Sequence, residues 1–273
     1  MSFIETSDGT RIFYKDWGQG RPVVLIHGWP LSADMWDFHA NALADEGLRA
    51  VSYDRRGFGR SDQPGGPYDY DTFAADLHAL LEALDLRDAV LVGFSMGGGE
   101  VVRYLSRFGS ERVAKAVLVS AAPPYLLKDE SNPDGIDRST FDDFIEQMKS
   151  DRPSFLASFG KKFYGAGLLS FTVSSEYLEY TSDLALQASL RSTLACVRAF
   201  SQTDFRGDLP AVRVPTLVIH GSSDQIVPLE IAGARSAEAI AGAQLRIYEG
   251  APHGLHYTEQ DRLLEDLLAF ARA

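Results

Sequence analysis

Short, almost unbroken apolar runs recur along this 273-residue chain and limit the folds that it can adopt. They lie at residues 23–26, 50–53, 89–92, 116–119 and 216–219. Such runs are typical of parallel strands, because helices cover both faces of a parallel sheet. Stretches with helical spacing lie between the runs. This alternation predicts an α/β fold with a doubly wound, mostly parallel sheet.

Both ends of the chain carry local signals. Asp8-Gly9 lies between β-like segments at residues 2–7 and 11–17, which predicts an antiparallel hairpin at the amino end of the sheet. Near the carboxyl end, Thr258 with Asp261 resembles a capping box before an apolar helical stripe. We therefore expect the chain to begin with a hairpin and to end with a capped helix.

The alternation breaks between about residues 123 and 207. This stretch has helical spacing and many aromatic residues, Phe171 among them, but no strand pattern. We interpret residues 123–207 as a helical cap inserted over the edge of the sheet. Residues 1–122 and 208–273 would then form the α/β core.

The segment Gly93-Phe94-Ser95-Met96-Gly97 follows one apolar run and precedes a helix-like stretch that ends at Gly109. A serine flanked in this way by small residues, between a strand and a helix, predicts a nucleophile elbow. The turn must be sharp to present the hydroxyl above the sheet edge, and glycine at both flanks leaves room for strand and helix to approach. Ser95 is therefore the candidate nucleophile.

A serine hydroxyl needs a base, usually histidine, that a carboxylate holds in one tautomer. The order serine, acid, histidine predicts Asp224 and His253 as these partners, since each follows a predicted strand. The carboxyl ends of parallel strands meet at one edge, where ligands bind. Asp204 and Asp208 are rival carboxylates, and His256 is the rival base.

The oxyanion of a tetrahedral intermediate needs two hydrogen-bond donors. We expect one to be the backbone N–H of Met96, which follows the nucleophile. The second is expected from the loop His27-Gly28-Trp29-Pro30, where the N–H of Trp29 is available. Pro30 has no N–H and favours an extended conformation at Trp29.

Other conspicuous residues are expected to have structural roles. Residues 54–62 mix charges with glycines after a strand, which predicts a hydrogen-bonded loop and not a dinucleotide site, because no helical pattern begins there. Cys196, the one cysteine, is expected to be a buried apolar residue. Four histidines at strand ends or within helical patterns are also expected to be structural: His27, His220, His39 and His78.

The composition limits the partners. The chain has 26 basic and 38 acidic residues, a net charge of −12, whereas nucleic acids and anionic membranes require a basic surface. No apolar stretch approaches the roughly 20 residues of a membrane span, and the first residues do not resemble a secretory signal. We expect a cytoplasmic protein that acts on a small molecule without a metal ion.

Three segments together resemble the α/β-hydrolase fold family, and within it the bacterial arylesterases and cofactor-free haloperoxidases (perhydrolases). They are residues 27–30 (HGWP), 54–61 (DRRGFGRS) and 93–100 (GFSMGGGE). The resemblance implies a Ser95, Asp224 and His253 triad, no cofactor and a homo-oligomer. It also implies that Pro30 favours perhydrolysis. Ser222 departs from the Asp or Asn of many relatives, which we expect to alter loop hydrogen bonds and not the triad.

The leading hypothesis is a serine hydrolase that cleaves short-chain or aryl esters, with peracid formation as a side activity. An apolar acyl site is expected beside Pro30, with cap aromatics on its wall: Phe141, Phe144, Phe159 and Phe163. Hydrolysis of an amide or γ-lactam by the same triad is one alternative. A ligand-binding protein without catalytic activity is another, because fold does not determine function.

Overall fold

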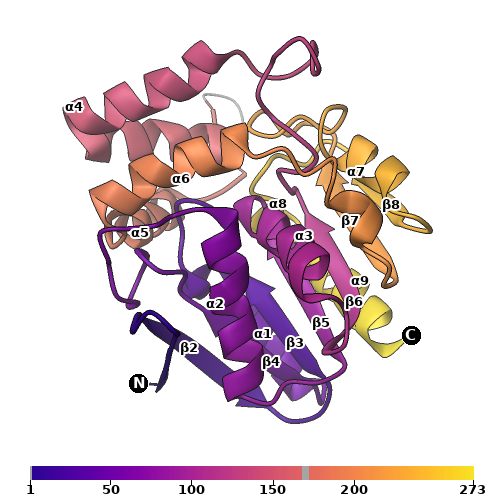
Figure 1. Ribbon diagram of the computed structural model, residues 1–273. Helices are drawn as coiled ribbons and strands as arrows, with labels where there is room; N and C mark the ends of the chain where they lie inside the picture. The colour runs from indigo at the N-terminus through magenta and orange to yellow at the C-terminus, as the bar shows by residue number, and fades with distance from the viewer. Residues whose placement is uncertain (1, 168–171) are drawn as a thin grey trace.

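The computed structural model describes residues 2–167 and 172–273, so Phe171 lies outside the described residues (Figure 1). Within them the chain forms one eight-stranded sheet with the order β1-β2-β4-β3-β5-β6-β7-β8. The pairs β1–β2 and β2–β4 are antiparallel, and all other pairs are parallel. The predicted sheet and its hairpin are confirmed. The strands are β1 (Ser2–Glu5), β2 (Arg11–Gly18), β3 (Pro22–Ile26), β4 (Arg49–Tyr53), β5 (Ala89–Phe94), β6 (Val113–Val119), β7 (Thr216–Gly221) and β8 (Gln244–Tyr248).

Helices cover both faces of the sheet. In Figure 1, α2 and α3 lie side by side in front of the strands and α9 lies behind them, where α1 packs against it. The helices α4, α5 and α6 lie together beyond the end of the sheet, at the upper left of the view. The helices are α1 (Asp37–Asp45), α2 (Tyr70–Ala83), α3 (Met96–Phe108), α4 (Arg138–Phe163), α5 (Ser175–Leu186), α6 (Leu190–Gln202), α7 (Gly233–Ala239), α8 (Leu255–Thr258) and α9 (Gln260–Arg272), with 3₁₀ turns η1 (Ala33–Trp36) and η2 (Leu209–Ala211). None of the helices in the described ranges is long and apolar enough to cross a membrane.

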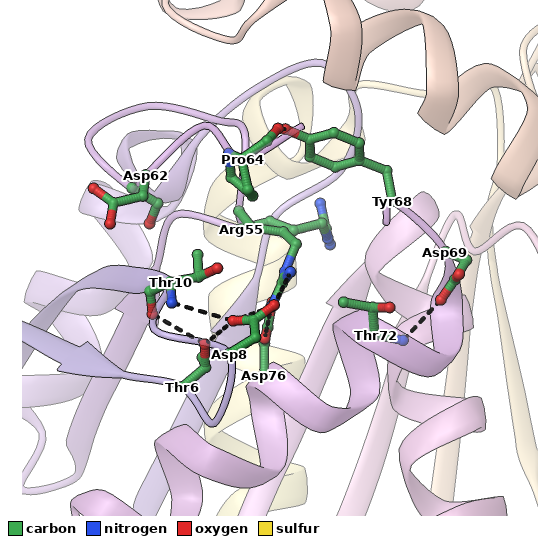
Figure 2. A network of polar contacts seen from close by, with 12 residues as sticks. Thr6, Asp8, Thr10, Arg55, Asp62, Pro64, Tyr68, Asp69, Thr72 and Asp76 are labelled. Atoms are coloured by element: carbon green, nitrogen blue, oxygen red, sulfur yellow. Dashed lines mark hydrogen bonds and ion pairs between the residues drawn. The ribbon is translucent and has the colours of Figure 1, made fainter. Parts of the chain in front are cut away.

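The turn between β1 and β2 is held by Asp8. Its carboxylate accepts hydrogen bonds from the Thr6 hydroxyl at 2.6 Å and the Thr10 amide at 3.1 Å (Figure 2). Gly9 adopts a φ of +82°, which glycine tolerates better than other residues. The Asp-Gly pair therefore builds the hairpin that the sequence predicts.

The core contains the side chains of the central strands and of one face of α2. Every residue of β5 is buried, as its apolar run predicts. On α2 the side chains of Phe73, Leu77, Leu80 and Leu81 are fully buried, whereas Leu84, just past the end of the helix, is partly buried. The side chain of Asp69 caps this helix by accepting from the Thr72 amide at 2.9 Å (Figure 2).

The predicted capping box at the carboxyl end is wrong. Thr258 ends the short helix α8, and α9 begins at Gln260 with no side-chain cap at Glu259. The Thr258 hydroxyl is buried and has no hydrogen-bond partner among the described residues. The two helices nearly join, so the threonine lies between them and not at a free amino end.

The segment between β6 and β7 is helical, and α4 bends within it. Asp151 has non-helical angles (φ −151°, ψ 85°), so α4 consists of two helices that meet at this residue. The Asp151 carboxylate caps the second half by accepting from the Ser154 amide at 3.0 Å. Pro153 lies in the first turn of that half, where its missing N–H is tolerated.

Candidate active site

Ser95 occupies the sharp turn between β5 and α3. Its backbone has a φ of +53° and a ψ of −117°, an unfavourable conformation for a residue with a side chain. A Cβ atom at Gly93 would lie 2.4 Å from the Gly97 oxygen, and one at Gly97 would lie 2.7 Å from the Ile26 oxygen. The flanking glycines therefore let strand, helix and β3 come together around the serine.

A continuous chain of hydrogen bonds joins Ser95, His253 and Asp224. Nε2 of His253 lies 3.0 Å from Oγ of Ser95, and Nδ1 lies 2.7 Å from Oδ2 of Asp224. Because a carboxylate can only accept, Nδ1 carries the proton and Nε2 is left to accept from the serine. The structure therefore brings together the three residues that the sequence singled out.

Asp224 is held as an anion. Its Oδ1 accepts the amide protons of Ile226 at 2.9 Å and Val227 at 2.8 Å. Burial opposes ionisation, but interactions with His253 and His220 outweigh it and hold the pKa of Asp224 well below its usual value. A fixed negative charge at this position would stabilise an imidazolium at His253.

The rival residues have other partners or none. Asp204 pairs with Arg206 at 2.6 Å, and Asp208 pairs with Arg103 at 3.2 Å. His256 is buried, and its ring nitrogens have no hydrogen-bond partner in the part of the chain that the structure describes. These geometries favour Asp224 and His253 over their rivals.

His220 contributes to the site in a way that the sequence analysis did not foresee. Its Nε2 donates to the Val227 carbonyl at 2.8 Å and lies 3.4 Å from the Asp224 carboxylate. The sequence feature that could have indicated this role is the position of His220 near the end of β7, four residues before Asp224.

The nearby Ser222 donates to Glu249 and accepts from the Gly250 amide, so its hydrogen bonds stay within its own loop region.

The two expected oxyanion donors face no competing acceptor. Among the described residues, neither the N–H of Trp29 nor that of Met96 forms a hydrogen bond. The Trp29 indole is anchored by donating to the Thr193 carbonyl at 3.1 Å. A Cβ atom at Gly28 would lie 3.0 Å from Cβ of Ser95, so this loop packs directly on the nucleophile. Both amides are thus available at the serine.

A buried ion pair connects the segments that carry these donors. The Arg55 guanidinium donates to Oε2 of Glu100 at 2.8 Å and to the His27 carbonyl at 2.9 Å. Glu100 lies on the helix that follows Ser95, and His27 begins the loop that contains Trp29. The amide of Arg55 also donates to Nε2 of His27 at 2.9 Å. The predicted structural role of His27 is confirmed.

The rest of the segment at residues 54–62 is also used in hydrogen bonds. Arg56 donates to Asp76 at 2.6 Å and to Asp8 at 2.8 Å, which ties the first hairpin to α2. Asp54 accepts from the backbone and side chain of Arg60, each at 2.8 Å. The prediction of a hydrogen-bonded loop is confirmed.

A cavity of about 240 Å³ opens beside Ser95 and His253. Of the aromatic residues predicted for the acyl site, Phe141, Phe144 and Phe159 line it. Other lining residues were not predicted from the sequence. They come from α6, the loops after β6 and β7, and α4: Leu126, Ile136, Thr140, Lys162, Phe200, Gln225, Ile226, Val227 and Pro228.

The other two predicted substrate residues lie elsewhere. Pro30 and Phe163 line a neighbouring cavity of about 20 Å³. The ring of Phe163 packs edge-on against that of His253, with centroids 4.7 Å apart. Phe163 therefore supports the histidine from behind and does not face the larger cavity.

Cys196 is buried, as predicted, and burial raises the pKa of its thiol to about 12. Within residues 2–167 and 172–273, no cluster of three or more His, Cys, Asp or Glu side chains has the arrangement of a metal site.

Known proteins share this chain's sequence and fold. A family model described as the alpha/beta hydrolase fold matches residues 21–260. A putative non-heme chloroperoxidase of Synechocystis is 49% identical over 97% of this chain and 96% of its own. A bifunctional esterase/perhydrolase of Acinetobacter calcoaceticus is 43% identical over the full length of both. The crystal structure of a bromoperoxidase from Bacillus anthracis has a TM-score of 0.95 and 46% identity, with both chains fully covered. The chain belongs to the α/β-hydrolase fold family.

Proposed function

We propose that this protein is a serine hydrolase that cleaves short-chain or aryl carboxylic esters through an acyl-enzyme and forms peracids as a side activity. The hydrogen-bonded chain from Asp224 through His253 to Ser95, ending at an apolar cavity, carries this proposal. Relatives that are named as a chloroperoxidase, a bromoperoxidase and an esterase/perhydrolase support it.

Ester cleavage follows from the roles of these groups. Oγ of Ser95 attacks the carbonyl carbon while Nε2 of His253 takes its proton. The amides of Trp29 and Met96 stabilise the oxyanion. The ester C–O bond then breaks, and His253 returns the proton to the leaving alcohol. An acyl group remains on Ser95.

The acyl-enzyme is released by one of two nucleophiles. Water gives the carboxylic acid, and hydrogen peroxide gives the peracid; in each case His253 removes the proton of the attacking oxygen and returns it to Ser95. The peracid can transfer one oxygen atom to a halide ion, which yields hypohalite and the parent acid. Esterase and haloperoxidase activities thus share one intermediate.

We also propose that α4, α5 and α6 form the cap (residues 123–207) over a core of residues 1–122 and 208–273. Support comes from Phe141 and Phe159 of α4 and Phe200 of α6, which line the cavity. A homo-oligomer is proposed from the family resemblance. Light scattering during size-exclusion chromatography tests it, and a monomer would remove this proposal.

The central test is hydrolysis of p-nitrophenyl esters from acetate to decanoate by the wild type and Ser95→Ala. We expect a maximum at short acyl chains and a loss of about 10⁴ or more in kcat in the variant. Ser120→Ala is a matched control, since Ser120 is also buried, follows a parallel strand and has positive φ, but does not line the cavity. Retained turnover in Ser95→Ala would refute the proposal.

Peracid formation is measured separately, as iodide oxidation in acetate buffer with hydrogen peroxide. The wild type and Ser120→Ala should both show it, and Ser95→Ala should not. Oxidation that survives in Ser95→Ala would mean that peracid does not arise from the acyl-enzyme.

A further inference from the structure

The wall of the cavity beside Ser95 changes character toward solvent. Ser95, His253 and Phe141 are buried, whereas Lys162 and Gln225 are exposed. Among the described lining residues Lys162 is the one permanent cation, and no Asp or Glu lines the cavity. The apolar interior therefore ends at a rim that carries a single positive charge.

The bend in α4 explains why Lys162 is at this rim. The two halves meet at Asp151, and the rings of Phe144 and Phe159 pack across the bend with centroids 5.7 Å apart. Lys162 is one helical turn beyond Phe159 and so lies on the same face. Lys161 is rotated by about 100° from that face and does not line the cavity.

The Lys162 ammonium group also has no counter-ion among the described residues. Lys15, Lys128 and Lys149 pair with carboxylates, for example Lys149 with Glu146 at 2.8 Å. In the part of the chain that the structure describes, Lys162 shares the lack of such a partner with Lys115 and Lys161, but of these three it alone lines the cavity. Within the described ranges, no carboxylate lies within ion-pair distance of Lys162. On a protein with a net charge of −12, an unpaired cation beside an apolar cavity is a local site for an anion.

We propose that Lys162 binds a carboxylate of the substrate, and that the preferred substrates are esters with a carboxylate at the far end of an apolar chain, such as half-esters of dicarboxylic acids. The chain would lie against Phe141, Phe144 and Phe159. Thr140 and Gln225, which also line the cavity, can donate hydrogen bonds to the same carboxylate. This inference rests on the proposed ester hydrolysis at Ser95.

The test compares monoethyl and diethyl esters of succinate, glutarate, adipate and pimelate, which differ in charge at each chain length. Initial rates of acid release are followed in a pH-stat. The wild type should have a lower KM for the half-ester at one or more lengths. Lys162→Met should raise that KM about two- to fivefold with kcat unchanged, as expected for loss of one exposed ion pair. The KM of the diester should change less than that of the half-ester.

Lys161→Met is the matched control, and it should leave the KM of both ester types unchanged. Lys162→Arg should retain the preference, and added salt should reduce the preference in every protein that shows it, the wild type included. Equal effects of Lys162→Met on half-ester and diester, or equal effects of Lys161→Met, would overturn the inference.

The inference and the proposed function fail in different ways. Diester hydrolysis that needs Ser95, together with a higher KM for every half-ester, would overturn the anion site and leave the serine hydrolase intact. Absence of Ser95-dependent hydrolysis of either ester type would overturn both.

Discussion

Protonation of a buried histidine should lower the free energy of unfolding of this protein below neutral pH. His39 lies on α1 with 1% of its surface exposed, packed against the rings of Trp36 and Phe38. Burial lowers the pKa of His39 from 6.5 to about 4, against a weak opposing contact with the backbone of Gln260. The unfolded chain therefore binds a proton that the folded chain excludes.

The two pKa values of His39 determine how the unfolding free energy changes with pH. Since the folded pKa is below the unfolded one, the stability from neutral His39 is complete above pH 6.5 and is lost as the pH falls toward 4. Between pH 7 and pH 5 the loss is about 2 kcal/mol of unfolding free energy. His39→Gln cannot take up this proton and should lose about 2 kcal/mol less over the same range.

Urea unfolding of both proteins at pH 7, 6 and 5, followed by tryptophan fluorescence, measures this difference. The pH dependence of the unfolding free energy is compared between the two proteins. The effect of the substitution on packing does not enter, because it is the same at every pH. His78→Gln, the same substitution at a side chain that is 31% exposed, is the comparison for a histidine that is not fully buried. Parallel curves for wild type and His39→Gln would refute the assignment of a neutral, buried His39.

Three further substitutions test the geometry around the nucleophile. Gly97→Ala should cost about 1–3 kcal/mol of unfolding free energy, because the new methyl would lie 2.7 Å from the Ile26 oxygen; an undiminished urea midpoint would contradict this packing. Glu100→Gln leaves Arg55 buried without its carboxylate and should cost about 3 kcal/mol in the same assay, whereas a loss below 1 kcal/mol would mean that solvent reaches the pair. Phe144→Ala should shift the preferred p-nitrophenyl ester to a longer acyl chain, and an unchanged optimum would place that chain elsewhere.

The strands and the nucleophile turn could be predicted because local signals determine them. Unbroken apolar runs mark strands buried on both faces, and the glycines around Ser95 mark a turn that few other residues allow. The geometry then brought together Ser95, Asp224 and His253, which are far apart in sequence. Chain order was sufficient because the carboxyl ends of parallel strands meet at one edge.

The cavity wall was less predictable because it depends on how α4 bends. Helical spacing identified Phe141 and Phe144, but Lys162 reaches the same wall only through the break at Asp151. The sequence carried a signal for this break, since Asp151 followed by Pro153 is typical of a new helix start. Phe163 was misplaced for the same reason, as it lies behind His253.

The backbone of Ser95 has a thermodynamic consequence beyond the reaction. A residue with a side chain held at a φ of +53° and a ψ of −117° destabilises the native state by about 1–3 kcal/mol. Glycine, which has no Cβ, would adopt the same turn with less strain. The native state would therefore be more stable with glycine than with serine at position 95. Selection for stability alone would replace the serine. The persistence of serine here would then depend on selection for turnover.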